Sequence, residues 1–428
     1  MAVAITGIKE FRSESEAPLQ AWPLLMIIGL YPLWFLLGIS GFMWVALAVP
    51  MTISLSQRRS LVAPKGFGFW VLFLIGVTGS ALSLDSISRS FFFFLRFGWY
   101  LGATVFLLYL VNGGTGITVW RIIRMFTFFW MATVAGGYLA FVLGDFTFSS
   151  PMAYLLPQFL LDNDLIKTLV NPSFADNHDF LGFPVPRSKA PFAYTNSWGS
   201  MLALLTPFGL MALSDVRVGV PKRLIQLTLL ASIVPAVTSL NRGLWLSLGV
   251  GVLYATFRSG TVGQRKIIGR LGLLGAFAAA LYYFTPLGEL IVARLSEGHS
   301  DKARSSLATE AVVRGLERPI FGWGSPRSFV PNLPPIGTHG QVWNLIFSYG
   351  IVGLVGWVGA MLTFFWKSRK PINQVGLWAH TVIVISLVQI FFYLQVPHQL
   401  FTVMAAVAIA IRAKEITSIN KTEAKLVN

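Results

Sequence analysis

GELIVARLSEGHSDKARSSLATEAVVRGLERPIFGWGSPRSFVPNLPPIGTHGQ, residues Gly288 to Gln341, is a polar stretch between two apolar runs. Each of these runs is long enough to lie in a bilayer. The stretch carries several arginines and a Gly/Pro-rich turn, and it ends at His339, just before hydrophobicity resumes. Basic groups and an imidazole at a membrane surface indicate chemistry on an anionic lipid headgroup.

The composition around this stretch is that of a membrane protein. Of 428 residues, 55% are hydrophobic and 12% are charged, and the mean hydropathy is +0.67. A soluble domain has about 25% charged residues. The chain contains no cysteine, which excludes disulfides, thiolate metal sites and a Cys nucleophile. The composition predicts an all-α, polytopic integral membrane protein.

The hydrophobic pattern predicts about twelve transmembrane helices, because runs of about 15 to 25 mostly apolar residues recur along the chain. They are placed near 22–38, 40–56, 66–84, 91–111, 121–144, 197–214, 224–240, 243–257, 271–286, 342–366, 377–395 and 399–413.

The net charge of +16 is explained by the distribution of Lys and Arg. With a cytoplasmic N-terminus, every short loop on the cytoplasmic side is basic, which is the positive-inside pattern, so no nucleic-acid partner is needed. The predicted parts are a cytoplasmic tail (1–21), spans one to five (22–144), an extracytoplasmic loop with an interfacial helix (145–196), spans six to nine (197–286), a large extracytoplasmic loop (287–341), spans ten to twelve (342–413) and a cytoplasmic tail (414–428).

Arg96 falls inside the predicted fourth span, where an arginine is costly unless it is paired or faces water. A structural pair with Asp85 and snorkelling to the interface are one interpretation. Contact with a lipid phosphate is the other.

Further basic residues lie at the outer ends of spans. Arg187 and Asn196 precede the sixth span, and Arg187 is either an interfacial anchor or an anion ligand. Asn241 and Arg242 form the apex of a tight outer turn. An arginine there runs against the positive-inside bias and indicates an anionic partner, unless it only faces lipid phosphates.

The large loop contains a predicted helix that starts near Ser300 and stops at Pro319. Arg304, Arg314 and Arg318 fall within an arc of roughly 80° on it. They form either a phosphate-binding face or, through Glu310 and Glu317, a solvated salt-bridged face.

The remaining histidines lack metal-binding spacing, and we interpret His178, His299, His380 and His398 as structural or solvated. No nucleotide-binding or serine-hydrolase motif is present. The sequence therefore predicts neither a metal site nor a cofactor.

Four stretches together resemble the superfamily of O-antigen ligases and O-unit (exopolysaccharide) polymerases, which are membrane glycosyltransferases. They are RSKAPFAYTNSWG (Arg187 to Gly199), TSLNRGLWLSLGVG (Thr238 to Gly251), RSSLATEAVVRGLERPIFGWGSPRSF (Arg304 to Phe329) and THGQVWNLIFSYGIVGLVG (Thr338 to Gly356). Many members have asparagine directly after the histidine, whereas Gly340 follows His339 here.

The resemblance implies a GT-C-like fold and transfer of a glycan from a polyprenyl (undecaprenyl) diphosphate carrier to a glycan or lipid-glycan acceptor. The site would be extracytoplasmic, in the bacterial inner membrane. His339 would be the catalytic base. The diphosphate ligands would be Arg187, Arg242, Arg304, Arg314 and Arg318, with Asn196, Asn241 and Arg96 in support.

The reaction would be inverting and metal-independent, with membrane lipids and other polysaccharide-assembly proteins as partners. The pattern leaves open whether the protein is a ligase or a polymerase. A multi-span transporter or flippase of lipid-linked oligosaccharide is the main alternative, and a scaffold of an export complex is another.

Overall fold

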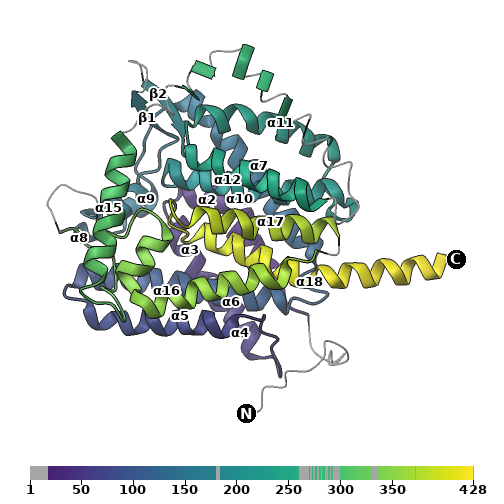
Figure 1. Cartoon of the computed structure of the whole chain (residues 1–428), viewed down its shortest axis with the longest axis horizontal. Coiled ribbons are helices and arrows are strands. Elements are labelled where there is room, and N and C mark those ends of the chain that lie inside the picture. The colour runs from purple at the N-terminus through teal and green to yellow at the C-terminus, as the bar shows by residue number, and fades with distance from the viewer. Residues whose placement is uncertain are drawn as a thin grey trace.

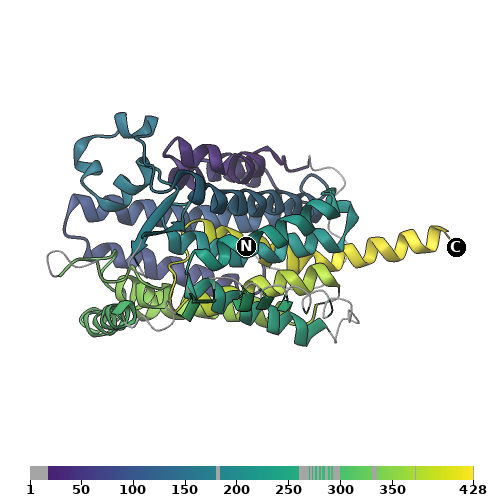
Figure 2. The same ribbon diagram turned by 90° about the horizontal axis from the view of Figure 1, so that it is seen from above.

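The structure is a computed structural model that describes residues 18–179, 184–259, 299–329, 335–371 and 373–427, with isolated residues between 269 and 292. This part of the chain is mostly helical. The long helices run roughly side by side in one bundle (Figure 1), and the same bundle is seen from above in Figure 2. The prediction of an all-α architecture is confirmed at this level, since the two short strands are a minor feature.

The elements follow each other along the chain with few long connections. They are α1 (Trp22–Leu24), π-helical η1 (Leu25–Gly29), α2 (Tyr31–Leu36), α3 (Ser40–Ala46), α4 (Ala48–Ser56), α5 (Phe67–Ser80), η2 (Ala81–Ser83), α6 (Ile87–Val111), α7 (Val119–Leu143), η3 (Pro151–Tyr154), α8 (Gln158–Leu161), α9 (Asp164–Val170), β1 (Ala175–Asp179), β2 (Pro184–Ser188), α10 (Thr195–Ser214), η4 (Val216–Val218), α11 (Lys222–Thr238), α12 (Arg242–Ser259), α15 (His299–Gly315), α16 (Gln341–Ser368), α17 (Gln374–Gln389) and α18 (His398–Val427).

Four described helices, α6, α7, α10 and α16, are long and apolar enough to cross a membrane. Shorter apolar helices cover Ser40–Ser56, Phe67–Ser83, Gln374–Gln389 and His398–Ala413. The predicted twelve spans are therefore not reproduced as twelve long helices. One reason is that apolar runs are broken, as at Leu30 between η1 and α2. Half of the residues in the predicted span at 271–286 lie outside the described residues.

Other predicted boundaries also change. In the loop 145–196, the predicted interfacial helix is divided into η3, α8 and α9, and Pro157 separates the first two of these pieces. β1 and β2 then form an antiparallel hairpin in which Asp176 is opposite Arg187. The predicted tail at 414–428 is not a separate segment, because α18 continues helically to Val427.

α16 is broken at Gly350, which has a φ of +61°. The segment that follows α15 supplies hydrogen-bond partners on both sides of the break. The amides of Trp323 and Gly324 donate to the carbonyls of Phe347 and Ser348 (2.9 and 2.8 Å), and the amide of Ile351 donates to the carbonyl of Pro319 (2.8 Å). Backbone groups freed inside an apolar bundle need such partners. The segment 319–324 supplies them and is therefore part of the bundle.

α5 packs closely on α16 through glycines. A methyl group at Gly76 of α5 would lie 2.6 Å from the backbone nitrogen of Gly353. One at Gly356 would lie 2.3 Å from the nitrogen of Phe73. Small residues allow two helices to approach in this way when lipid surrounds them. The contact fixes α16, and with it the loop that precedes it.

Basic turns gather at one end of the bundle. Arg412 of α18 donates to the carbonyls of Leu110 and Ile117, and Arg124 donates to Val218. Arg258 likewise donates to the carbonyl of Arg369. At the opposite end lie the β1–β2 hairpin, α8, α9 and α15, on the left of Figure 1. The basic turns and the hairpin therefore lie at opposite ends of the bundle.

Candidate functional site

Arg187 is buried at the end of the bundle that carries the hairpin. It lies on β2, is only 7% exposed, and its Nε donates to the carbonyl of Ser239 (2.8 Å) in the turn between α11 and α12. On the neighbouring strand, Asp176 accepts hydrogen bonds from Lys189 (3.3 Å) and Thr195 (2.8 Å). The hairpin thus fixes Arg187 against the turn that contains Asn241 and Arg242.

Asn241 holds this turn in place. Its Oδ1 accepts from the amide of Leu244 (3.2 Å), which caps α12, and also from the hydroxyl of Tyr393. Its Nδ2 donates to the carbonyl of Thr195 (3.3 Å). Asn241 is therefore a positioning residue, and the half-buried Arg242 follows it as the first residue of α12.

Tyr393 connects the segments that meet here. It lies in the turn between α17 and α18. Burial raises the pKa of its hydroxyl, while the positive charges of Arg304 and Arg187 act in the opposite direction. Both guanidiniums therefore lie close to one buried hydroxyl, although they are far apart in the sequence. No sequence signal marks Tyr393, because it lies in an apolar run predicted to be a span.

A cavity of about 610 Å³ opens beside this turn between α15 and the start of α16. Its wall includes Arg304, Ser305, Thr309 and His339, together with the apolar side chains of Trp343 and Phe391. A basic group and an imidazole thus face one space that has an apolar wall.

The contacts of His339 define which ring nitrogen is free. Thr338 donates its hydroxyl hydrogen to the carbonyl of Pro335 (2.6 Å), and the same oxygen lies 2.9 Å from His339 Nδ1. That oxygen must therefore accept from Nδ1–H, which leaves the lone pair of the neutral imidazole on Nε2. Burial, and then the charge of Arg304, lower the pKa of His339 below its usual 6.5. The ring is thus a neutral base at pH 7.

The loop that carries His339 is fixed at both ends. Asn344 donates through Nδ2 to the carbonyl of Gly337 (2.8 Å). The amide of Gln341 donates to the carbonyl of Tyr393, and Trp343 Nε1 donates to the carbonyl of Phe391, both at 2.9 Å. An asparagine thus supports the loop even though Gly340, and not asparagine, follows His339.

The three arginines of α15 and the segment after it have different surroundings. Arg304 lines the cavity, whereas Arg314 and Arg318 do not. Arg314 pairs with Glu310 and Glu317, both at 2.8 Å, and Arg318 lies over the ring of Trp323, 4.4 Å from its centroid. The three arginines therefore do not form one face of the cavity, and the salt-bridged interpretation is confirmed for Arg314.

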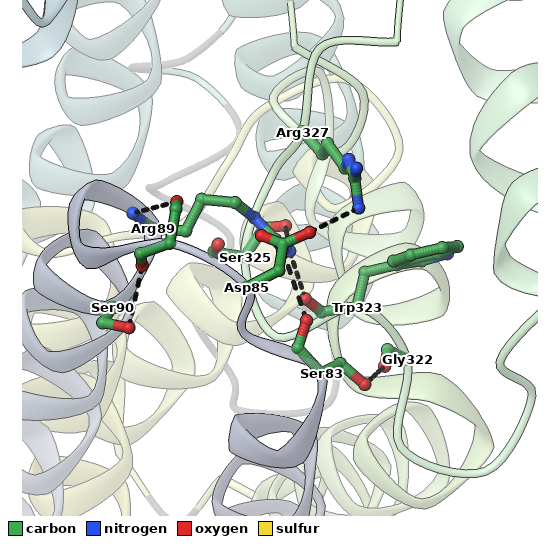
Figure 3. A network of polar contacts seen from close by, with 9 residues as sticks. Ser83, Asp85, Arg89, Ser90, Gly322, Trp323, Ser325 and Arg327 are labelled. Atoms are coloured by element: carbon green, nitrogen blue, oxygen red, sulfur yellow. Dashed lines mark hydrogen bonds and ion pairs between the residues drawn. The ribbon is translucent and has the colours of Figure 1, made fainter.

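The predicted pair between Arg96 and Asp85 is wrong. Asp85 binds Arg89 and also Arg327 (2.8 Å), as Figure 3 shows. Ser83 donates to the carbonyl of Gly322 (2.8 Å), and Arg89 donates to that of Trp323. This network ties the turn before α6 to the segment after α15.

The other predicted residues do not line the cavity. Asn196 is half-buried in the first turn of α10, next to Thr195. His380 hydrogen-bonds to Tyr254 and Ser368, and His398 hydrogen-bonds to Tyr31, which fits their structural interpretation. The side chains of His178 and His299 lie outside the described part. Within the described residues, no group of three His, Asp or Glu is placed to hold a metal ion.

The arrangement as a whole offers a neutral imidazole base and several guanidiniums at one end of an apolar helical bundle. A comparison of the sequence with protein-family models gave no match, and no curated protein matches it.

Proposed function

We propose that the protein is a membrane glycosyltransferase that moves a glycan from a polyprenyl diphosphate carrier to an acceptor hydroxyl. One observation carries the proposal: His339 and Arg304 line the same cavity, while Arg304 and Arg187 both lie near the Tyr393 hydroxyl. A base next to several fixed cations suits a reaction in which a proton leaves one substrate and a diphosphate leaves the other.

In the proposed reaction, His339 Nε2 takes the proton of the acceptor hydroxyl. The oxygen attacks the anomeric carbon as the bond between that carbon and the diphosphate breaks. Arg187, Arg242 and Arg304 stabilise the negative charge on the departing diphosphate, because charge-assisted hydrogen bonds strengthen as the oxygen gains charge. Direct displacement inverts the anomeric centre. The proton and the leaving group are both accounted for without a metal ion.

The proposal includes a location. The end of the bundle with the cavity faces the outside of the bacterial inner membrane, and the basic turns face the cytoplasm. A polytopic GT-C-like arrangement of about twelve membrane segments, some formed by short or broken helices, would surround the polyprenyl chain. The acceptor is a glycan or lipid-glycan, supplied together with other polysaccharide-assembly proteins.

The proposal is tested by a transfer assay with purified protein and lipid-linked glycan. His339→Ala should lower turnover by roughly 10²- to 10⁴-fold, the usual contribution of a general base. Arg318→Gln is the matched control, because Arg318 is exposed and outside the cavity. Normal turnover in folded His339→Ala would refute the base assignment.

A lipid-linked oligosaccharide transporter is the alternative, and one observation favours it. Arg96 is buried inside the bundle, and ionisable groups inside a membrane often mark a substrate path. A flux assay in proteoliposomes separates the two. Flux of lipid-linked glycan without transfer, unchanged in His339→Ala, would favour transport.

A further inference from the structure

Four polar groups where α6 meets the first half of α16 lack hydrogen-bond partners within the described part of the chain. They are Arg96 Nη1, the hydroxyls of Tyr100 and Tyr349, and Gln341 Nε2. Arg96 is 8% exposed, and the other three residues are fully buried. Nearly all buried polar groups in proteins find partners, so four adjacent exceptions require a reason.

The four groups are neighbours. The rings of Tyr100 and Tyr349 pack edge to face with centroids 5.8 Å apart. Arg96 approaches both phenols, and Gln341 approaches Tyr100, but none of these contacts has the geometry of a hydrogen bond. They form one cluster built from α6 and α16.

The cluster is rich in donors. A guanidinium has no acceptor, and Gln341 already uses its Oε1 to accept from the amide of Gln395 (3.0 Å), which leaves only its NH₂ group. Each phenol has a hydroxyl hydrogen to donate. An anionic oxygen could accept from all four groups, whereas a further donor could bind only to the two phenol oxygens and would leave Arg96 and Gln341 unsatisfied.

The charge of Arg96 also needs a partner. No ion pair holds it among the residues that the structure places, and Asp85, the nearest carboxylate in the sequence, is occupied by Arg89 and Arg327. An uncompensated guanidinium inside an apolar bundle is strongly unfavourable.

We infer that Arg96, Tyr100, Tyr349 and Gln341 form a binding site for a phosphoryl group. The site adjoins the candidate active site, because the amide of Gln341 donates to the carbonyl of Tyr393 (2.9 Å) and Gln341 follows His339 by two residues. If the proposed function holds, the occupant is a phosphate of the donor's diphosphate. That identity rests on the proposed function, whereas phosphoryl binding does not.

The experiment uses the full chain in phosphatidylcholine nanodiscs, with farnesyl diphosphate as the probe. Affinity and the thermal midpoint are measured for the natural protein, Tyr100→Phe, Tyr349→Phe and Arg96→Gln. Each phenylalanine variant removes one unpaired hydroxyl, so the midpoint without ligand should be unchanged or higher. The Kd should rise roughly tenfold, as expected for a lost hydrogen bond to a charged group.

Tyr109→Phe is the matched control. Tyr109 lies on the same helix and is equally buried, but its hydroxyl donates to the carbonyl of Gln20 (2.7 Å). This variant should lower the midpoint and leave the Kd unchanged. The phenylalanine variants keep the test decisive even if Arg96→Gln does not fold.

The inference is overturned if Tyr100→Phe and Tyr349→Phe lower the unliganded midpoint and leave the affinity for farnesyl diphosphate intact. Water would then satisfy the hydroxyls.

Two further arms identify the source of the phosphoryl group. Inorganic pyrophosphate tests the headgroup without a lipid chain. Phosphatidylglycerol nanodiscs test bulk lipid. A higher thermal midpoint in these nanodiscs that is lost in the same variants would keep the site but assign it to a membrane phospholipid. Binding that persists in a protein without any glycan transfer would refute the proposed function and leave the phosphoryl site standing.

Discussion

His339 takes its chemical character from Thr338 and Arg304. Thr338 directs the imidazole proton to Nδ1, and Arg304 faces the same cavity. Burial of the ring and the positive charge of Arg304 both disfavour the protonated form. The imidazole of His339 therefore stays neutral at a lower pH than an exposed histidine would.

This predicts the pH dependence of the proposed reaction. In kcat/KM, the acidic limb should lie below pH 6.5, because the pKa of His339 is depressed from that value. Arg304→Gln removes a positive charge, so the limb should move to higher pH, whereas Arg304→Lys should keep it low. An acidic limb that stays in place in Arg304→Gln would contradict the proposed electrostatic link.

A second prediction concerns Thr338 as a positioning residue. Thr338→Val keeps the shape but removes the oxygen that accepts from Nδ1–H. We expect kcat to fall roughly tenfold, with KM little changed, because a hydrogen bond of about 1.4 kcal/mol is lost from the oriented base. Thr338→Ser should restore the rate. Equal losses in the valine and serine variants would show that the hydroxyl does not orient the ring.

At the scale of elements, the break in α16 depends on Gly350. Its φ of +61° disfavours any side chain, and a methyl group there would lie 2.4 Å from the carbonyl oxygen of Ile320. Gly350→Ala should therefore lower the free energy of unfolding by roughly 1–3 kcal/mol. Thermal unfolding in detergent measures this change.

Gly249→Ala is the control for that variant. Gly249 lies within α12, and a methyl group there would meet nothing within 4 Å. This substitution should be neutral or stabilising by up to about 1 kcal/mol, since alanine favours helix. Similar effects of the two substitutions would argue against a special backbone at Gly350.

The network around Asp85 predicts a coupling between elements. Asp85→Asn weakens the pairs to Arg89 and Arg327, but the carboxylate is 47% exposed, so the cost in stability should be at most about 1 kcal/mol. Amide hydrogen exchange should rise in the segment 322–327, which the network holds. Unchanged exchange there would show that the network has no restraining role.

Sequence patterns could predict only part of this arrangement of helices. Long apolar runs such as Ile87–Val111 and Val119–Leu143 are evident from hydropathy, and the arginines and His339 stand out against them. The break at Gly350 was not visible, because glycine inside an apolar run is common in membrane helices. The hairpin was also missed, since Pro184 and Pro186 give β2 little strand character.

Contacts between distant segments were beyond sequence patterns altogether. Arg187, Arg304 and His339 could be predicted as candidates from their residue types and resemblance to a family motif. Tyr393 could not be predicted, because a tyrosine in an apolar run has no distinguishing sequence signal. Only the fold brings Asn241 and Arg187 beside it. The ion pair of Asp85 with Arg327 could not be predicted either, because the two residues are distant in the sequence.

For the whole molecule, the two ends of the bundle should lie on opposite sides of the membrane. The chain has no cysteine, so single-cysteine variants can be labelled without background. Leu155→Cys, near α8, should react with a membrane-impermeant maleimide on spheroplasts. Ser60→Cys, in a basic turn at the other end, should react only after permeabilisation. Labelling of both variants from outside would contradict the proposed orientation.

The pairing of the segment 319–324 with α16 also limits how this part of the chain can be replaced. Because that segment completes the backbone of a bundle helix, exchanging it alone would leave amides and carbonyls at the break without partners. A stable chimera would have to transfer the segment together with the part of α16 around Gly350. The structural unit is therefore larger than the polar loop that the hydropathy pattern indicates.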